Sequence, residues 1–238
     1  MKTKLQKELN TKIKKIIQRT HNIKSFQLDD TGGVDFTAGQ FMSVFLGEGK
    51  DLMRYLSISS SPTEKGFIEF TKKITDSKFS KRLDAAEVGT PMRIKYPMGN
   101  FTIREGRKKI AFLSGGIGIT PVRSICKYIC DSRLNKEVIL LYGNRSSRDI
   151  AFKEDFDEIK EECPGFKAVH ILSQPEAEWQ GKTGHISPDL VTEEIPDYSE
   201  RQFYICGPPL MVSGVKSILQ DELKLSEENI ITENFKGY

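Results

Sequence analysis

Residues that build disulfides and metal sites are scarce in this sequence. Its 238 residues include four cysteines, at positions 126, 130, 163 and 206, and three histidines. The cysteines form no C-x-x-C pair, and the histidines are scattered along the chain. This spacing excludes a disulfide framework, a zinc module and a plant-type iron–sulfur cluster. We therefore expect no bound metal.

Long apolar segments are missing as well. No run approaches the ~20 apolar residues of a membrane-spanning helix. No apolar segment follows the basic first residues, so we expect no secretory signal. The composition, 37% hydrophobic and 29% charged, is typical of a folded globular protein. The sequence thus predicts a cytoplasmic protein without a membrane span, and its length favours two modest domains.

Neither sign of charge dominates, since the formal net charge is +3. Residues 1–100 contain 18 basic against 11 acidic residues, and residues 101–238 contain 18 against 22. A nucleic-acid-binding protein would usually be more basic and would carry aromatic residues within its basic run, so we expect no nucleic acid. The basic surplus of the first half is either a docking face for an acidic partner or a set of ordinary solvated lysines.

Residues 11 to about 103 alternate short β-like runs with turn signals. Strands at such spacing are typical of a small antiparallel β-barrel. One helix is expected to interrupt them, with Ser80 at the position of its N-cap. The predicted strands span residues 13–17, 26–28, 41–46, 52–58, 67–74 and 92–96.

From residue 108 the pattern changes to apolar runs that alternate with helical segments. Phe152, Phe156 and Ile159, for example, are spaced for one face of a helix. This alternation predicts a doubly wound parallel α/β sheet. The charged segment 103–109 is the natural boundary, so we expect a β-barrel domain at 1–105 and an α/β domain at 106–238. The predicted strands span residues 110–113, 138–142, 169–172, 203–206 and 230–232.

Three motifs lie where such folds bind ligands. The glycine-rich segment 114–121 follows an apolar strand and opens a helix. Glycines let the backbone come close to a ligand, and the free N–H groups of a helix start suit an anion. The segment does not match the dinucleotide-binding pattern G-x-G-x-x-G. The arginine and the hydroxyls of strand 54–62 suit a phosphate and a polar ring edge. Cys206-Gly207-Pro208 ends a strand, which is where open α/β sheets bind ligands. Each motif also has a structural explanation: a tight turn, an edge strand facing water, and a buried cysteine.

Together, and in this order, the motifs resemble the ferredoxin–NADP reductase family of flavoproteins over residues 12–238. The family pattern is R-x-Y-S, then G-G-x-G-x-T-P, then C-G-P, and last an acidic residue two places before an aromatic one. The resemblance implies an FAD-dependent oxidoreductase that takes a hydride from NADH or NADPH. Its electrons would pass to a separate acceptor, such as ferredoxin, flavodoxin or an oxygenase component. The matching residues are Arg54 and Ser57, Gly115 to Pro121, Cys206 to Pro208, and Glu233 with Phe235.

The resemblance also implies roles for individual residues. Arg54 would pair with the pyrophosphate of FAD, helped by the helix start at Ser80, and the catalytic residues would be Ser57, Cys206 and Glu233, which tune the hydride transfer. The implied cofactor-binding residues are Arg54, Tyr55, Leu56, Ser57, Lys72, Lys73, Ile74, Phe79, Ser80, Gly115, Gly116, Gly118, Thr120, Asn144, Arg145, Ser173, Cys206, Gly207, Pro208 and Phe235.

The chain departs from the family pattern at one important position. Leu56 stands where the family has a tyrosine that lies against the flavin ring. Tyr55 occupies the variable position, and strand alternation should turn it to the other face. A leucine can still pack on the ring. A second departure is Ser77, near a position where the family often has glycine.

Other functions of the same cofactors remain open. The segment 174–184 resembles that of flavin reductases, which release reduced flavin, and a flavin-bearing electron-transfer subunit of a larger complex is a further alternative. We expect a monomer whose partner is a small redox protein or an oxygenase component. Gln174 stands where NADP-selective members carry an arginine, which favours NADH. Arg145 and Arg148 could form another phosphate pocket.

Overall fold

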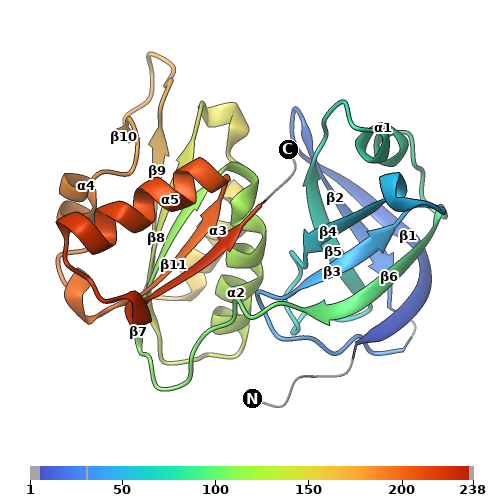
Figure 1. The fold of residues 1–238 in the computed structure, drawn as a ribbon, viewed down its shortest axis with the longest axis horizontal. Coiled ribbons are helices and arrows are strands. Elements are labelled where there is room, and N and C mark those ends of the chain that lie inside the picture. Colours follow the sequence, from blue (N-terminus) through green and yellow to red (C-terminus); the bar gives the residue numbers. More distant parts are fainter. Residues whose placement is uncertain (1–5, 31, 236–238) are drawn as a thin grey trace.

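The short strands of the first half pair into an antiparallel sheet that curls into a barrel, as their pattern predicts. The computed structural model describes residues 6–30 and 32–235, and within them this sheet has six strands in the order β4-β3-β6-β1-β2-β5. A bridge between Ile58, just after β4, and Phe70 of β5 connects the two ends of that order. Figure 1 shows this barrel beside the second domain. The strands are β1 (Lys7–Thr20), β2 (Ile23–Asp29), β3 (Phe41–Phe45), β4 (Met53–Ser57), β5 (Phe67–Lys73) and β6 (Pro91–Met98).

Inward-facing side chains and one short helix fill the barrel. Phe26 of β2 and Phe70 of β5 are fully buried and stack with ring centroids 5.2 Å apart. Helix α1 (Lys78–Asp84) buries Phe79 and Leu83 in the same core. Burial of large apolar side chains such as these is worth about 1.5–3 kcal/mol each, so α1 is an integral part of the barrel.

The N-cap of this helix is Ser77, and the prediction of Ser80 was wrong. The Ser77 hydroxyl accepts a hydrogen bond from the backbone N–H of Ser80 at 3.3 Å. Ser80 lies three residues further along, is fully buried, and shares a hydrogen bond with the Thr75 hydroxyl at 3.1 Å. Both serines are good caps by residue type. The earlier one serves because Phe79 must already be helical to reach the core.

The second half forms a parallel sheet, again as predicted. Among the described residues it has six strands in the order β10-β9-β8-β7-β11-β12, and every pair is parallel. The chain order reverses between β7 and β11, which makes their carboxyl ends a topological switch point. The strands are β7 (Lys109–Gly115), β8 (Glu137–Asn144), β9 (Phe166–Leu172), β10 (Lys182–Thr183), β11 (Gln202–Gly207) and β12 (Ile230–Asn234).

Helices cover both faces of this sheet, and each face has its own core. Helices α2 (Ile119–Asp131) and α3 (Lys153–Glu162) pack on the face turned toward the barrel, whereas α4 (Pro188–Glu194) and α5 (Pro209–Ser217) pack on the other (Figure 1). None of the helices within 6–30 and 32–235 has the length and apolarity to cross a membrane. Short 3₁₀ turns lie at Lys50–Leu52, Gly116–Gly118, Ser147–Asp149, Tyr198–Glu200 and Glu227–Asn229, and Ile218–Glu222 is a π-helical turn.

The segment between β6 and β7 is tied to the second domain by one tyrosine. The buried Tyr204 of β11 accepts a hydrogen bond from the Arg104 N–H at 3.0 Å and donates one to the Thr102 carbonyl at 3.2 Å. Phe101 packs edge-on against the same ring. The predicted domain boundary after residue 105 falls in this segment and stays a prediction.

A buried arginine joins the two domains. Arg123 of α2 is 6% exposed, and it donates to the Ser59 carbonyl of the barrel at 3.2 Å and to Glu64 at 3.0 Å. Asp155 of α3 accepts from its Nε at 2.8 Å and also pairs with Arg19 of β1 at 3.1 Å. Apolar contact supports these bonds, because Ile23 and Ala38 of the barrel belong to the core that α2 and α3 form.

We predict that Arg123→Met strongly destabilises the protein. The substitution leaves the partly buried carboxylate of Glu64 without its cation and Asp155 with Arg19 alone, and breaking such a buried pair costs about 3–5 kcal/mol. The exposed i,i+4 pair of Lys127 with Asp131 on the same helix is the matched control, and Lys127→Met should cost less than about 1 kcal/mol. Urea unfolding curves of the two variants measure both effects. Equal losses would contradict the role given to Arg123.

Candidate functional site

The carboxyl ends of the parallel strands open into a large cavity at the domain junction. Its volume is about 750 Å³. Both domains contribute to its walls, since the turn between β1 and β2 reaches it from the barrel. Open α/β sheets bind nucleotides at this place. The lining includes His21, Asn22, Ile23, Lys73, Ser114 to Ile117, Gly143 to Arg145, Arg148, Asp149, Ser173, Gly184 to Ile186, Pro208, Leu210, Met211, Gly214, Val215 and Ile218.

The glycine-rich segment packs so closely that only glycine fits at one of its positions. A Cβ at Gly118 would lie 2.4 Å from the carbonyl oxygen of Cys206. Gly116 has a φ of +52°, which L side chains rarely adopt. The Thr120 hydroxyl closes the turn by donating to the Ile117 carbonyl at 3.1 Å. The segment therefore presents backbone to the cavity, which suits a ligand that binds through its phosphates.

Two polar groups on the wall of this cavity lack partners in the described part of the chain. They are the hydroxyl of Ser114, at the end of β7, and the side-chain N–H₂ of Asn144, at the end of β8. Both residues line the cavity. Buried polar groups normally find a hydrogen bond, so a polar ligand such as a nicotinamide nucleotide fits them. Arg145 and Arg148 add positive charge at the same wall.

Two cations lie together beside α1 in the barrel domain. The guanidinium carbon of Arg54 is 5.5 Å from the centroid of the Phe79 ring. Lys72 is 4% exposed, and burial followed by the charge of Arg54 lowers its pKa to about 8. Its ammonium donates to the Lys73 carbonyl at 2.9 Å. Such a pair of like charges is stabilised by a bound anion, so these residues fit the pyrophosphate of FAD.

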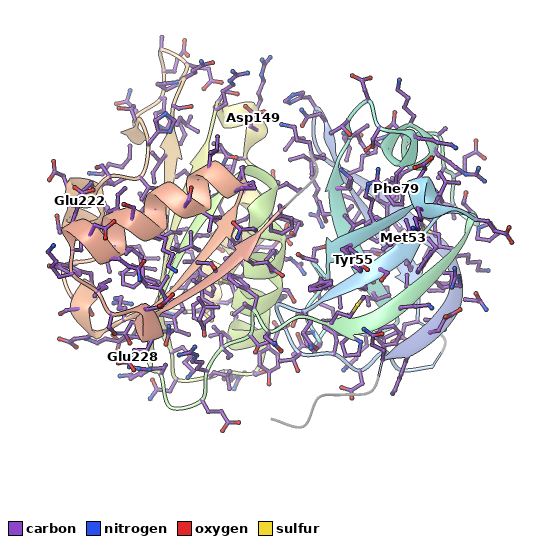
Figure 2. The ribbon with its side chains drawn as sticks, in the orientation of Figure 1. Met53, Tyr55, Phe79, Asp149, Glu222 and Glu228 are labelled. Carbon is purple, nitrogen blue, oxygen red and sulfur yellow. The ribbon has the colours of Figure 1, made fainter. Side chains whose placement is uncertain are left out.

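The two faces of β4 differ sharply in exposure. Leu56 pairs with Met42 and packs in the barrel core at 8% exposure. Tyr55 is 61% exposed, and its ring lies edge-on to Phe41 with centroids 5.8 Å apart. Figure 2 shows Tyr55 toward the second domain, whereas Met53 and Phe79 lie further from it. Strand alternation therefore separates Tyr55 from Leu56 as expected.

An acid and a thiol lie side by side at the end of the sheet. Cys206 of β11 pairs in register with Glu233 of β12. The Glu233 Oε2 atom is buried without a partner among the described residues, and burial raises the pKa of this carboxyl to about 7. Burial, and then the charge of Glu233, raises the pKa of the Cys206 thiol well above its usual value. The Phe235 N–H donates to the Gly207 carbonyl at 3.1 Å, which holds the chain beside this pair.

The structure gathers the residues named from the sequence into three groups, and their roles stay predictions. Lys73, Gly115, Gly116, Asn144, Arg145, Ser173 and Pro208 line the large cavity. Arg54, Tyr55, Leu56, Ser57, Lys72, Ile74, Phe79 and Ser80 lie on β4, the end of β5 and α1. Gly118, Thr120, Cys206, Gly207, Glu233 and Phe235 lie at the start of α2 and around the ends of β11 and β12.

Sequence reasoning missed several residues of the cavity wall. His21 and Asn22 form the turn between β1 and β2, and they reach the cavity only because the domains pack together. His21 Nε2 lies 3.8 Å from Asp149 of the other domain. No local pattern marks such a contact. His185 follows Gly184 (φ +92°) at the end of the segment that resembles flavin reductases, so this residue could have been included.

The fold and the site define a two-domain oxidoreductase that binds a flavin and a nicotinamide nucleotide. The family model for the oxidoreductase FAD-binding domain matches residues 8–103, and that for the oxidoreductase NAD-binding domain matches residues 112–217. The chain belongs to the ferredoxin reductase-like family of flavoproteins, as the motifs predicted. Its cofactors are FAD and NADH or NADPH.

Known proteins of this family resemble the chain over most of its length. It is 30% identical to the glycine betaine monooxygenase reductase subunit of Chromohalobacter salexigens, over 89% of this chain and 60% of that protein. It is also 30% identical to NADH-cytochrome b5 reductase 1 of Dictyostelium discoideum, over 89% of this chain and 77% of that one. The ferredoxin NADP⁺ reductase of Neisseria gonorrhoeae shares the fold, with a TM-score of 0.80 at 22% identity over 95% of this chain and 98% of that chain. The chain thus spans less than two thirds of the first relative's length.

We predict that Arg54→Ala weakens FAD binding by about tenfold or more. The variant loses a charge-assisted contact, worth about 1.5–3 kcal/mol. Arg93→Ala is the control, because the Arg93 guanidinium lies 3.9 Å over the Phe45 ring, away from α1. Flavin retained after dialysis, and titration of the apoprotein with FAD, measure the change. An unaltered affinity for Arg54→Ala would remove Arg54 from the pyrophosphate site.

A second prediction concerns the pH dependence of stability. Burial raises the pKa of Glu233 from its usual 4.5 to about 7 in the folded protein. The stability that its protonation contributes is therefore fully present below pH ~4.5 and is lost as the pH rises through ~7. Glu233→Gln should therefore stabilise the apoprotein by about 2 kcal/mol at pH 8, allowing for solvent screening, and change nothing at pH 4. Chemical unfolding at both pH values tests this expectation. A difference that does not vary with pH would contradict it.

Proposed function

We propose that the chain is a reductase that moves a hydride from NADH to FAD and then passes the electrons to a separate redox protein. One observation carries this proposal. Residues of both domains line the nucleotide cavity, and Lys73 on its wall directly follows Lys72 of the cationic pair in β5. The Cys206–Glu233 pair lies at the carboxyl ends of the parallel sheet, where Pro208 reaches the same cavity. This arrangement would allow one chain to hold both cofactors with their reacting ends together.

The residues contribute binding and orientation rather than strong acid–base chemistry. Bound FAD supplies the acceptance of a hydride and the release of electrons singly or in pairs. Arg54 and Lys72 would hold its pyrophosphate, and Ser114 with Asn144 would bind the nicotinamide nucleotide. Cys206 packs under the glycine-rich segment and would set how closely the nicotinamide approaches. Ser57, Cys206 and Glu233 remain the residues proposed to tune the transfer.

The acceptor we propose is a small redox protein or an oxygenase component. Two relatives support this choice by name, since one is a monooxygenase reductase subunit and the other a cytochrome b5 reductase. The surplus of basic residues in 1–100 favours an acidic carrier. We further propose that the protein acts as a monomer in the cytoplasm. Its four cysteines are all free thiols, which is usual in that compartment.

Steady-state assays test this function. The FAD-bound protein is given NADH together with ferredoxin, flavodoxin, cytochrome b5, a Rieske oxygenase component or free FMN. A protein carrier should be reduced fastest, and its rate should fall as salt rises, because exposed charges are screened beyond about 10 Å at 0.1 M. Flavin should stay with the protein on gel filtration. Reduction of free flavin alone, with loss of FAD on the column, would identify a flavin reductase instead.

We also propose that Tyr55, rather than Leu56, supplies the aromatic surface against the flavin ring. Tyr55 is exposed on the outer face of β4, whereas Leu56 is inside the barrel. An aromatic side chain stacked on a flavin quenches its fluorescence. Tyr55→Leu should therefore raise the fluorescence of the bound FAD severalfold, and the core substitution Leu56→Met should leave it unchanged. The reverse result would assign the ring contact to position 56.

NADH should be preferred over NADPH by about tenfold in kcat/KM. Asp149 lines the cavity next to Arg145 and Arg148, so its charge opposes a 2′-phosphate and offsets their attraction. A single charge-assisted contact of this kind is worth about 1.4 kcal/mol or a factor of ten. Asp149→Asn should improve the use of NADPH, and Asp157→Asn, on the exposed face of α3, should not. A clear NADPH preference in the native protein would make Arg145 and Arg148 the selectivity residues.

A further inference from the structure

A second cavity lies at the opposite edge of the parallel sheet. Its volume is about 490 Å³, and it is bounded by the last turns of α2, the start of β8 and the segment between α3 and β9. The strands are parallel, so their amino ends face away from the nucleotide cavity at their carboxyl ends. Nothing in the proposed reaction uses this place.

Three of the four cysteines line this second cavity. Cys126 and Cys130 are one turn apart on α2 and therefore lie on the same face of the helix. Cys163 ends α3 on the opposite wall. The Cys130 Sγ lies 3.7 Å from Oε2 of Glu162, the residue before Cys163, and Cys163 is among the groups that raise the pKa of the Cys130 thiol. The fold thus brings two thiols from separate helices to one cavity beside a carboxylate.

We propose that Cys130 and Cys163 form a thiol-oxidation site that closes to a reversible disulfide when it meets a small anionic disulfide of the glutathione type. Cys163 is the half-exposed member of the pair and takes the first step. Its thiolate attacks one sulfur of the oxidant, which forms a mixed disulfide and releases one molecule of the reduced thiol.

The second step uses the proximity of the two protein sulfurs. Cys130 attacks the Cys163 sulfur, and the departing thiolate takes the Cys130 proton and leaves as the second reduced thiol. The protein loses two hydrogens and two electrons, and the oxidant is reduced to two thiols. Burial raises the pKa of Cys130 to about 12, so this thiol reacts only when the sulfur it attacks is already in contact.

Charge and access select the oxidant and the pair. Arg133 and Lys136 line the same cavity together with Glu137 and Glu162, and Glu137 is paired with Lys108 at 2.8 Å. The two cations can therefore meet the carboxylates of a glutathione-type disulfide. Cys126 also lies on the cavity wall, but it is buried more deeply in the core that α2 and α3 form. This burial raises the pKa of the Cys126 thiol far above that of an ordinary thiol. The structure therefore favours Cys163 with Cys130 over Cys163 with Cys126.

Peptide mapping of the native protein tests the proposal. The FAD-bound protein is incubated with oxidised glutathione, quenched with N-ethylmaleimide before denaturation, and digested with trypsin without reductant. Trypsin separates the four cysteines into fragments 124–127, 128–133, 161–167 and 202–216. We expect fragments 128–133 and 161–167 to be joined by a disulfide that dithiothreitol reverses, while flavin stays bound.

Two variants make the result specific. Cys163→Ser should abolish the joined fragment, and Cys126→Ser should retain it. If a variant fails to fold, the fragments joined in the native protein still decide the pairing. Fragment 161–167 found joined to 124–127, or carrying glutathione without any joined partner, would overturn the proposal. A joined fragment that forms only after FAD is lost would also overturn it, because the pairing would then belong to the unfolded chain.

Discussion

The relation between the two domains depends on one buried guanidinium. Arg123 is held by the barrel through the Ser59 carbonyl and Glu64, and by its own domain through Asp155. A buried ion is tolerable only while its partners are in place, so Arg123 favours the arrangement in which the two domains are docked. Because α2 begins directly after the glycine-rich segment, the contact that joins the domains also positions the nucleotide cavity against the flavin residues of the barrel.

The site itself is built mainly from backbone held at close range. A Cβ at Gly118 would overlap the end of β11, so the glycine-rich turn and Cys206 approach as nearly as their main chains permit. Ser114, Asn144 and Glu233 leave buried polar atoms without partners in the described residues, and all three lie at the carboxyl edge of the sheet. Unpartnered buried polar atoms lower the stability of the protein without its cofactors. A bound nucleotide that forms hydrogen bonds with them would raise the stability of the folded state by mass action.

Local patterns predicted every strand but the two-residue β10, because alternation and short apolar runs follow from burial of each strand on its own sheet. They failed where tertiary packing chooses between equivalent residues. Ser77 and Ser80 are both good caps, and only the burial of Phe79 decides between them. His21 enters the cavity wall through the docking of one domain on the other. The proximity of Cys130 and Cys163 likewise joins residues from two helices whose packing no motif encodes.

The departure of β4 from its family pattern has a simple geometric reading. Register pairs Leu56 with Met42 inside the barrel and Tyr55 with Ser43 on the outer face. The aromatic residue has therefore moved by one position, and a shift of one residue along a strand exchanges its faces. Phe41 lies against the Tyr55 ring, and a Cβ at Gly99 would come within 2.6 Å of Phe41. Two aromatic rings thus form one surface outside the barrel, and the close approach of the Gly99 backbone supports the Phe41 ring within it.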